Sequence, residues 1–315
     1  MLKRRSIWVL VLVCVLGMAA ASGAADPKYL RIGTASLGGN YFPMGAALGV
    51  LIEEKIPDVK ATAQATGGSS FNLVAMEDGE QELALCQGPA VAQGIASGAS
   101  TKARTIVNYN STPQHILVRK GSGIETVADF KGKRIEVIAA GDGIETATKL
   151  FMETLGIGWD NIEPVYSGNR VQASSAFKTG RVDAIIDATG IGASWIGDIL
   201  GDGSNFKLIS LGDDDIAKIT AAHREFSVAK IPANAYRGQP EEVRTVGNWV
   251  VVVAHESLSD DLVYNVTKAI LENRDFLKER HNYFKDLAPE NIVGAVIAPL
   301  HPGAEKYYRE LGVLK

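Results

Sequence analysis

The sequence predicts an α/β protein of two lobes, each a mixed β-sheet with flanking helices. Short β-rich runs alternate with helical runs, which is the pattern of α/β proteins. The β-rich runs are apolar with little polar alternation, as expected for strands that helices cover on both faces. The second half of the chain also repeats the loop, helix and strand pattern of the first, which favours two lobes of one design.

The elements of the first half follow from local patterns. Apolar β-rich runs predict strands, and longer runs with helical spacing predict helices. Asn40 is a good N-cap for the first helix, and Pro43 is tolerated in its first turn. The predicted elements are a strand at 29–34, a helix at 41–55, a strand at 59–65, a helix at 69–76 and a strand at 82–87.

Two later strands are expected to join the lobes. Residues 114–120 and 248–256 are strongly apolar and would cross from one lobe to the other. Lobe 1 would then hold residues 26–114 and 251–315, and lobe 2 residues 115–250. Ligands of such sheets bind beyond the carboxyl ends of the strands, where the Gly-rich loops lie, so we expect a ligand cleft between the lobes.

Residues 1–25 have the features of a secretory signal peptide. Three basic residues precede an apolar run from position 7 to 18, and small residues end near Ala25. Export to a bacterial periplasm is the interpretation, with a retained N-terminal anchor as the alternative. The exported chain would keep one cysteine, Cys86, so an intramolecular disulfide is excluded.

The net charge of the exported chain limits the classes of partner that are expected. The leader holds three of the 32 Lys and Arg residues and none of the 36 Asp and Glu residues. The remaining 29 cations and 36 anions give a formal net charge of −7. This argues against nucleic acid or an anionic membrane surface as partner. It does not exclude an anionic ligand, because backbone amides can make one site locally positive.

Three Gly-rich loops each enter a helix, where free N–H groups and the helix dipole favour an anion. They are GTASLGGNYF (33–42), TGGSSFN (66–72) and AAGDGIETAT (139–148), the last with Asp142 as the expected cap. The first loop lacks the Lys-Ser/Thr of a nucleotide-binding P-loop. For each loop the alternative is a capped turn without a ligand.

Motifs for catalysis and metal binding are absent from the sequence. It has no G-x-S-x-G, no H-E-x-x-H and no C-x-x-C, and its five histidines lack metal-ligand spacing and are expected at surface or edge positions. The acidic clusters at 213–215 and 260–261 are interpreted as helix starts. A hydrolytic site built from two carboxylates stays an alternative, because such residues can lie far apart in the chain and form no motif. We therefore expect no enzyme activity, cofactor or metal, and a binding protein is the leading class.

The chain resembles the TAXI family, the extracytoplasmic solute receptors of TRAP transporters. The resemblance rests on RIGTASLGGNYFPMGAALG, TGGSSFNLVAMEDGEQELALCQ, HILVRKGSGIETVADFKGKRIEV and IPANAYRGQ, in the right order along the chain. It implies a two-lobed periplasmic binding protein (type II-like) that closes on a small organic acid, such as glutamate or 2-oxoglutarate. The receptor would act as a monomer and deliver its ligand to a sodium-driven permease.

The resemblance also implies the ligand-binding residues. In order along the chain they are Ser36, Leu37, Gly38, Gly39, Asn40, Tyr41, Ser69, Ser70, Asn72, Gln87, Gly141, Asp142, Gly143, Ile144 and Glu145. From the sequence of lobe 2, Arg170 is the best carboxylate clamp, with a surface position as the alternative. Asp187 and Tyr236 are weaker cleft candidates.

Two departures from the family pattern bear on the ligand. The third loop commonly reads G-S-G-T, but here it is Gly141-Asp142-Gly143-Ile144, and Pro89 replaces a usual acidic residue. Asp142 would repel a second carboxylate or pair with a ligand ammonium. Two other classes stay open: a secreted α/β enzyme acting on a small carboxylate, and a receptor for a peptide or signalling partner.

Overall fold

A computed structural model describes residues 29–315 apart from 38 and 202. The predicted signal peptide and Gly38 lie outside the described residues. Within this part of the chain, none of the helices combines the length and apolar character needed to cross a membrane.

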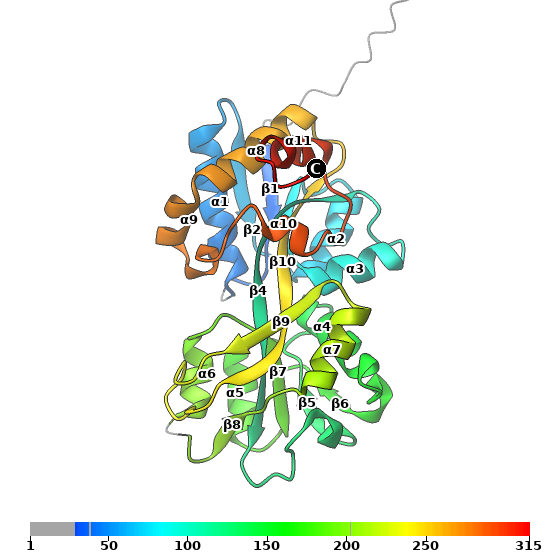
Figure 1. Ribbon diagram of the computed structural model, residues 1–315, viewed down its shortest axis with the longest axis vertical. Helices are drawn as coiled ribbons and strands as arrows, with labels where there is room; N and C mark the ends of the chain where they lie inside the picture. The colour runs from blue at the N-terminus through cyan, green and yellow to red at the C-terminus, as the bar shows by residue number, and fades with distance from the viewer. Residues whose placement is uncertain (1–28, 38, 202) are drawn as a thin grey trace, which may run out of the picture.

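The strands form two mixed sheets that share a pair of long strands. In the first lobe β1 lies between β2 and β3 and is parallel to both, and in the second lobe β5 lies in the same way between β6 and β7. β4 and β10 are antiparallel and run through both lobes (Figure 1). The strands are β1 (Tyr29–Gly33), β2 (Lys60–Gln64), β3 (Leu83–Gln87), β4 (Ala103–Arg119), β5 (Arg134–Glu136), β6 (Glu163–Val165), β7 (Ala184–Ala188), β8 (Phe206–Leu208), β9 (Phe226–Ile231) and β10 (Val243–His255).

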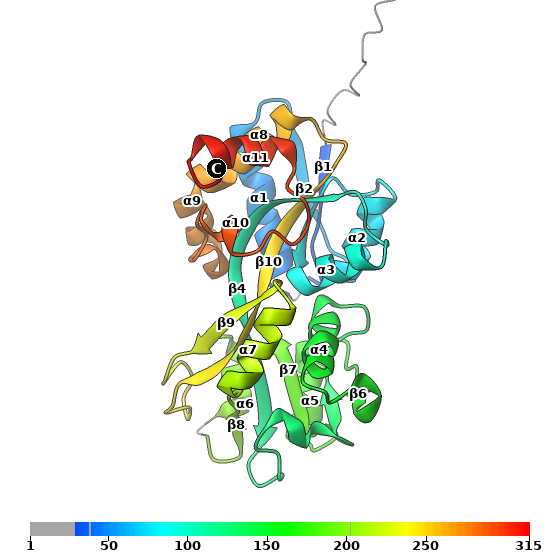
Figure 2. The same ribbon diagram turned by 45° about the vertical axis from the view of Figure 1, so that its right-hand side comes forward.

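Helices cover both faces of each sheet, which explains the apolar strands. In the first lobe α1, α8 and α11 share a core with one face, and α2 and α3 cover the other. In the second lobe α4 and α7 cover one face, and α5 and α6 the other (Figure 2). The helices are α1 (Tyr41–Lys55), α2 (Ser69–Glu77), α3 (Gly88–Ala96), α4 (Gly143–Thr154), α5 (Arg170–Lys178), α6 (Ser194–Leu200), α7 (Asp213–Ala222), α8 (Asp260–Glu272), α9 (Arg274–Arg280), α10 (Asn291–Gly294) and α11 (Pro302–Glu310), with 3-10 turns η1 (Val127–Phe130), η2 (Trp159–Asn161) and η3 (Asn282–Phe284).

The two lobes repeat one ion-pair arrangement. An arginine on the central strand donates to a carboxylate just before the next parallel strand and to the carbonyl of a glycine after the second helix. The glycine carbonyls accept at 2.8 Å in lobe 1 and 2.9 Å in lobe 2. The groups are Arg31, Glu82 and Gly79 in the first lobe, and Arg134, Asp183 and Gly180 in the second. The sequence repeat therefore corresponds to a structural repeat.

Most of the predicted elements are present within a residue or two. The helix at 41–55 has the predicted bounds, and the acidic clusters begin α7 and α8. The crossing strands extend further toward the N-terminus than the apolar runs suggested, because polar residues of β4 such as Asn108 lie buried inside the first lobe. The predicted lobe boundaries fall inside β4 and β10, and the division itself stays a prediction.

The surface or edge position expected for the five histidines is wrong for His115 and His301, which are buried. The Nδ1 of His115 lies 3.0 Å from the Pro113 carbonyl, and its Nε2 lies 2.8 Å from the Tyr236 hydroxyl. Burial lowers the pKa of His115 to about 4. His115 is therefore a neutral part of the interior where β4 passes between the lobes.

Candidate functional site

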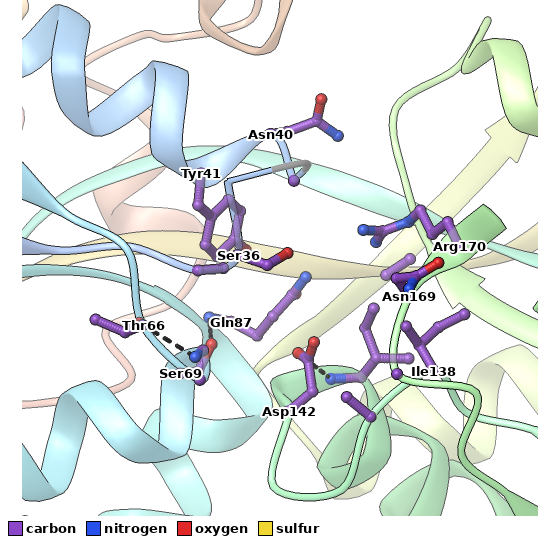
Figure 3. Close-up of a pocket in the computed structure, with 18 of the residues that line it drawn as sticks. Ser36, Asn40, Tyr41, Thr66, Ser69, Gln87, Ile138, Asp142, Asn169 and Arg170 are labelled. Carbon is purple, nitrogen blue, oxygen red and sulfur yellow. Dashed lines mark hydrogen bonds between the residues drawn. The ribbon is translucent and has the colours of Figure 1, made fainter. Parts of the chain in front are cut away.

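A cavity of about 620 Å³ lies between the lobes, beyond the carboxyl ends of the parallel strands. The loops after β1 and β2 and the last residue of β3 line it from lobe 1, and the loops after β5 and β6 and the last residue of β7 line it from lobe 2 (Figure 3). The predicted site residues that the structure brings to this cavity are Ser36, Gly39, Asn40, Tyr41, Ser69, Gln87, Asp142, Ile144 and Arg170.

Four helices begin at the cavity wall. Residues in the first turns of α1, α2, α4 and α5 line it, two helices from each lobe. The N–H groups of a first turn have no intrahelical acceptor, and the helix dipole is positive at that end. The cavity is therefore electropositive from its backbone, although the protein as a whole is acidic.

Asn40 of the first loop was predicted to cap α1 with its side chain, but it does not do so. The Asn40 side chain makes no capping hydrogen bond, and its amide donates at 2.8 Å to the hydroxyl of Tyr283. Leu37 was expected in the site, but its side chain is 69% exposed and does not line the cavity. The loop therefore presents Ser36, Gly39 and Tyr41 and turns Leu37 toward solvent.

Some residues of the second loop line the cavity, and others hold its wall in place. Ser69 lines the cavity, and its hydroxyl accepts at 3.0 Å from the backbone N–H of Gln87. Asn72 lies beneath the wall, where its amide donates at 2.7 Å to the carbonyl of Thr34. Ser70 is half-buried and does not line the cavity. Asn72 thus holds neighbouring loops together and does not itself line the cavity.

The third loop places a carboxylate in the cavity. Asp142 caps α4 as predicted, accepting at 3.2 Å from the N–H of Ile144. Burial raises the pKa of Asp142, while nearby Arg170 opposes that shift. Figure 3 shows this carboxylate directed toward the space between the lobes. Asp142 is thus both a structural cap and a charged group available to a ligand.

Three other predicted residues of this loop do not line the cavity. Glu145 accepts at 2.7 Å from the N–H of Gly141 and at 2.8 Å from the Tyr166 hydroxyl, which turns its carboxylate away. A side chain at Gly143 would come within 2.6 Å of the Cβ of Gln87. Gly143 therefore permits a close contact between lobes, and Gly141 and Glu145 shape the loop.

Arg170 lies in the cavity and is held by a buried ion pair. Its Nε and Nη2 donate at 2.7 and 3.1 Å to the two carboxylate oxygens of Asp187. Burial would lower the pKa of Arg170, but the charge of Asp187 outweighs it and keeps the pKa raised. Asp187 was also predicted to be in the site, but it is fully buried and does not line the cavity. It positions Arg170 instead.

Several lining residues were missed by the sequence analysis. Gly168 and Asn169 belong to the loop after β6, which matches the loop after β2 in the structural repeat. The repeat was the signal that could have found them. Thr112, on a crossing strand, and Tyr283, near the C-terminus, had no comparable signal.

Tyr283 connects the lobes at one side of the cavity. Its hydroxyl accepts from the Asn40 amide of lobe 1 and from the backbone N–H of Gly190 in lobe 2. The hydroxyl of Thr189 lies 3.2 Å away. Tyr236, a predicted cleft candidate, does not line the cavity, because its hydroxyl is directed to His115 and the N–H of Gly192.

A buried carboxylate holds two loops of lobe 2. Glu136 Oε1 accepts at 3.0 Å from the N–H groups of Ile138 and Ser167, and Oε2 accepts at 2.6 Å from the Ser167 hydroxyl. Ile138 lines the cavity with φ of 69°, a strained value for a β-branched residue. Glu136 therefore maintains the cavity wall without facing it.

Some polar atoms at the cavity lack partners. The hydroxyls of Tyr41 and Thr112 and the Oε1 of Gln87 are buried and make no hydrogen bond with the described residues. All three residues line the cavity. Buried polar atoms are normally satisfied, so these groups are available to a ligand or to water. Over the same part of the chain, no cluster of His, Cys, Asp and Glu has the arrangement of a metal site.

The fold is that of the periplasmic binding proteins. The aliphatic sulphonate binding protein of Escherichia coli is similar with a TM-score of 0.52 at 18% identity, covering 92% of this chain and 90% of that one. A Prochlorococcus marinus protein, PhnD1, solved with methylphosphonate, gives 0.55 at 13% identity over 92% and 100% of the two chains. A Xanthomonas citri protein bound to chloride gives 0.56 at 11% over 91% and 98%. These similarities establish the shared architecture.

The chain belongs to the NMT1-like family, which it matches over residues 32–312. That match spans nearly all of the described residues and includes every loop that lines the cavity.

Proposed function

We propose that this protein is a solute receptor outside the cytoplasm that captures a small organic anion between its lobes and passes it to a membrane transporter. The observation that carries the proposal is the convergence of four helix N-termini and Arg170 on one cavity. Donors from both lobes would contact one anion, so ligand binding would favour the closed arrangement of the lobes.

The size of the cavity suits a small molecule. Its volume of about 620 Å³ falls within the range typical of small-ligand pockets. Of the similar structures, one is an aliphatic sulphonate binding protein and another holds methylphosphonate. They support an anionic ligand here, and the resemblance to TAXI receptors favours a carboxylate among the anions.

The resemblance also supplies the finer assignment. We propose a sodium-driven TRAP permease as the transporter and a periplasmic location, reached through the signal peptide predicted at residues 1–25. The receptor would work as a monomer, because it must open, close and dock. The similar structures also include a putative L-cystine ABC transporter protein of Listeria monocytogenes. A transport assay with each kind of permease would distinguish the two partners.

The first prediction concerns ligand binding. A ligand that binds only the folded state stabilises it, so one member of a panel of carboxylates, sulfonates and phosphonates should raise the melting temperature. Arg170→Gln should abolish this shift. Arg134→Gln is a matched control, because Arg134 also pairs with a carboxylate in lobe 2 but does not line the cavity. Differential scanning fluorimetry measures both.

A second variant guards against misfolding of Arg170→Gln. Gly39 lines the cavity, and a Cβ there would meet only Ser36, at 3.2 Å from its carbonyl oxygen. Gly39→Leu should therefore fold and block the ligand. Failure of every anion to shift the melting temperature at millimolar concentration would contradict the proposed function, and unchanged binding by Gly39→Leu would remove the first loop from the site.

A further inference from the structure

We propose that the ligand is zwitterionic, with a primary ammonium group beside its anionic group, and that Asp142 binds the ammonium. This inference rests on the proposed function and concerns the same cavity. It names the chemical class of the ligand and assigns the residue that selects it.

The position of Asp142 is the first observation. It lies at the start of α4 on the lobe 2 wall, while Arg170 lies at the start of α5 on the same wall (Figure 3). The Gly68 loop of lobe 1 closes over Asp142, since a Cβ at Gly68 would lie 3.6 Å from the Asp142 carboxyl carbon. A ligand held between these loops contacts an acidic group as well as the donors.

The balance of charge is the second observation. Asp142 and Arg170 are the charged residues among the described lining residues. The bidentate ion pair with Asp187 already compensates the charge of Arg170. Asp142 is left without a side-chain cation of its own, so these three groups together carry a formal charge of −1. A second negative charge on the ligand would add to this repulsion, whereas an ammonium would remove it.

The unpaired polar atoms are the third observation. The Oε1 of Gln87 and the hydroxyl oxygens of Tyr41 and Thr112 are buried at the cavity and can accept hydrogen bonds. An ammonium group carries three N–H donors, of which a carboxylate takes one or two. Acceptors are therefore present beyond Asp142. The raised pKa of Asp142 fits a carboxylate that lacks its cation in the ligand-free protein.

The anionic end of the ligand has separate partners. The ion pair with Asp187 uses the Nε and Nη2 of Arg170, so Nη1 takes no part in it. The first turns of α1 and α2 supply backbone N–H groups from lobe 1. The ammonium group of such a ligand would thus face Asp142, and its anionic group would face Arg170 and the helix N-termini. α-Amino acids and aminosulfonates carry these two groups.

Matched pairs of compounds test the inference. Alanine and lactate, leucine and 2-hydroxy-4-methylpentanoate, glutamate and 2-hydroxyglutarate, and taurine and isethionate differ by exchange of an ammonium for a hydroxyl. Isothermal titration calorimetry should show one amine binding the wild-type protein at least about tenfold more tightly than its hydroxyl partner, since a buried carboxylate would lose its cation. Asp142→Asn should remove that preference.

The control is Glu153→Gln, which removes an exposed carboxylate of the same helix that does not line the cavity, and it should keep the preference. If a hydroxyl compound binds the wild-type protein as tightly as its amine, or if Asp142→Asn retains the preference, the inference is wrong while the anion receptor stands. If neither member of any pair binds, and no other anion does, the proposed function and the inference both fail.

Discussion

At the scale of single residues, Asp142 has two opposite effects on the stability of the folded protein. Its carboxylate caps α4, but burial raises its pKa, so the folded protein binds a proton there more tightly than the unfolded chain does. The free energy of unfolding therefore falls as pH rises from the ordinary aspartate pKa through the raised folded value. A residue that is unfavourable at neutral pH without ligand is expected where function requires it.

The second prediction concerns stability and not ligand binding. Asn caps helices as well as Asp does, so Asp142→Asn should keep α4 and remove the unfavourable charge. The ligand-free variant should be more stable than wild type at pH 7, and the gain should fade as the pH falls to about 4 and below, because the aspartate then becomes protonated in both states. Urea unfolding at several pH values measures it.

Asp129 provides a control of opposite sign. Hydrogen bonds from the N–H groups of Thr126 and Glu125 lower its pKa. Its charged form is favoured in the folded protein, so Asp129→Asn should reduce stability at pH 7 and have less effect at low pH. A gain for Asp129→Asn, or a loss for Asp142→Asn at neutral pH, would contradict this account.

The residue scale also shows where prediction from sequence stops. Asp142 caps α4 by accepting from the N–H of a residue only two positions later, so the local sequence was sufficient to predict this cap. Asn40 has the same local pattern, but its side-chain amide donates instead to the hydroxyl of Tyr283, which lies 243 positions later in the chain. Long-range contacts of this kind leave no trace in sequence spacing, which is why Tyr283 was missed.

At the scale of elements, the loops after β5 and β6 depend on Glu136. Its carboxylate accepts three hydrogen bonds and holds Ile138 at positive φ. Glu136→Ala would leave buried donors unsatisfied, at about 1–3 kcal/mol each. We expect the free energy of unfolding to fall by roughly 3 kcal/mol and ligand affinity to fall with it, as measured by urea unfolding and calorimetry.

Two variants sharpen this third prediction. Glu163 is exposed on the adjacent strand β6, and Glu163→Ala should change stability little. Glu136→Gln should recover part of the stability, because the amide keeps an acceptor for Ile138 or Ser167 and the Ser167 hydroxyl can reverse its role. A loss below about 1 kcal/mol for Glu136→Ala would show that these loops hold their shape without it.

The elements themselves were largely predictable. Apolar strands and helix spacing gave the order of elements in the first half, and the sequence repeat predicted a second unit of similar design. Arg170 was predicted from the segment after β6, but Gly168 and Asn169 were missed because SGNRVQ lacks the paired glycines of its counterpart TGGSSF. The wall there instead comes from Gly168 and the Asn169 cap, whose side chain accepts from the N–H of Gln172.

At the scale of the whole molecule, two close contacts hold the lobes together around the cavity. Gly143 of lobe 2 meets Gln87 and Ser69 of lobe 1, and Gly190 of lobe 2 meets the ring of Tyr283 from lobe 1. Neither contact leaves room for a side chain on the glycine. The closed arrangement therefore depends on glycine at both places.

The fourth prediction tests this closure. A Cβ at Gly190 would overlap the Tyr283 ring, so Gly190→Ala should separate the lobes at that side. Small-angle X-ray scattering of the ligand-free variant should give a larger radius of gyration than wild type, and ligand affinity should fall. Gly197→Ala is a control, because a Cβ there makes only an ordinary contact of 3.9 Å with Tyr236.

A double variant identifies the cause. Tyr283→Ala removes the ring, so adding Gly190→Ala to it should change the scattering curve no further. If Gly190→Ala alone leaves both the radius and the affinity at wild-type values, the Tyr283 contact does not control closure.

The position of Tyr283 has a kinetic consequence. Its hydroxyl is bonded to Asn40 on one lobe and to Gly190 on the other, and these bonds exist between protein groups alone. A ligand that leaves by separation of the lobes would require these bonds to break, so the barrier to its dissociation would include a part independent of ligand chemistry. The Tyr283 hydrogen bonds would then lengthen the residence times of ligands of different affinity by a similar factor.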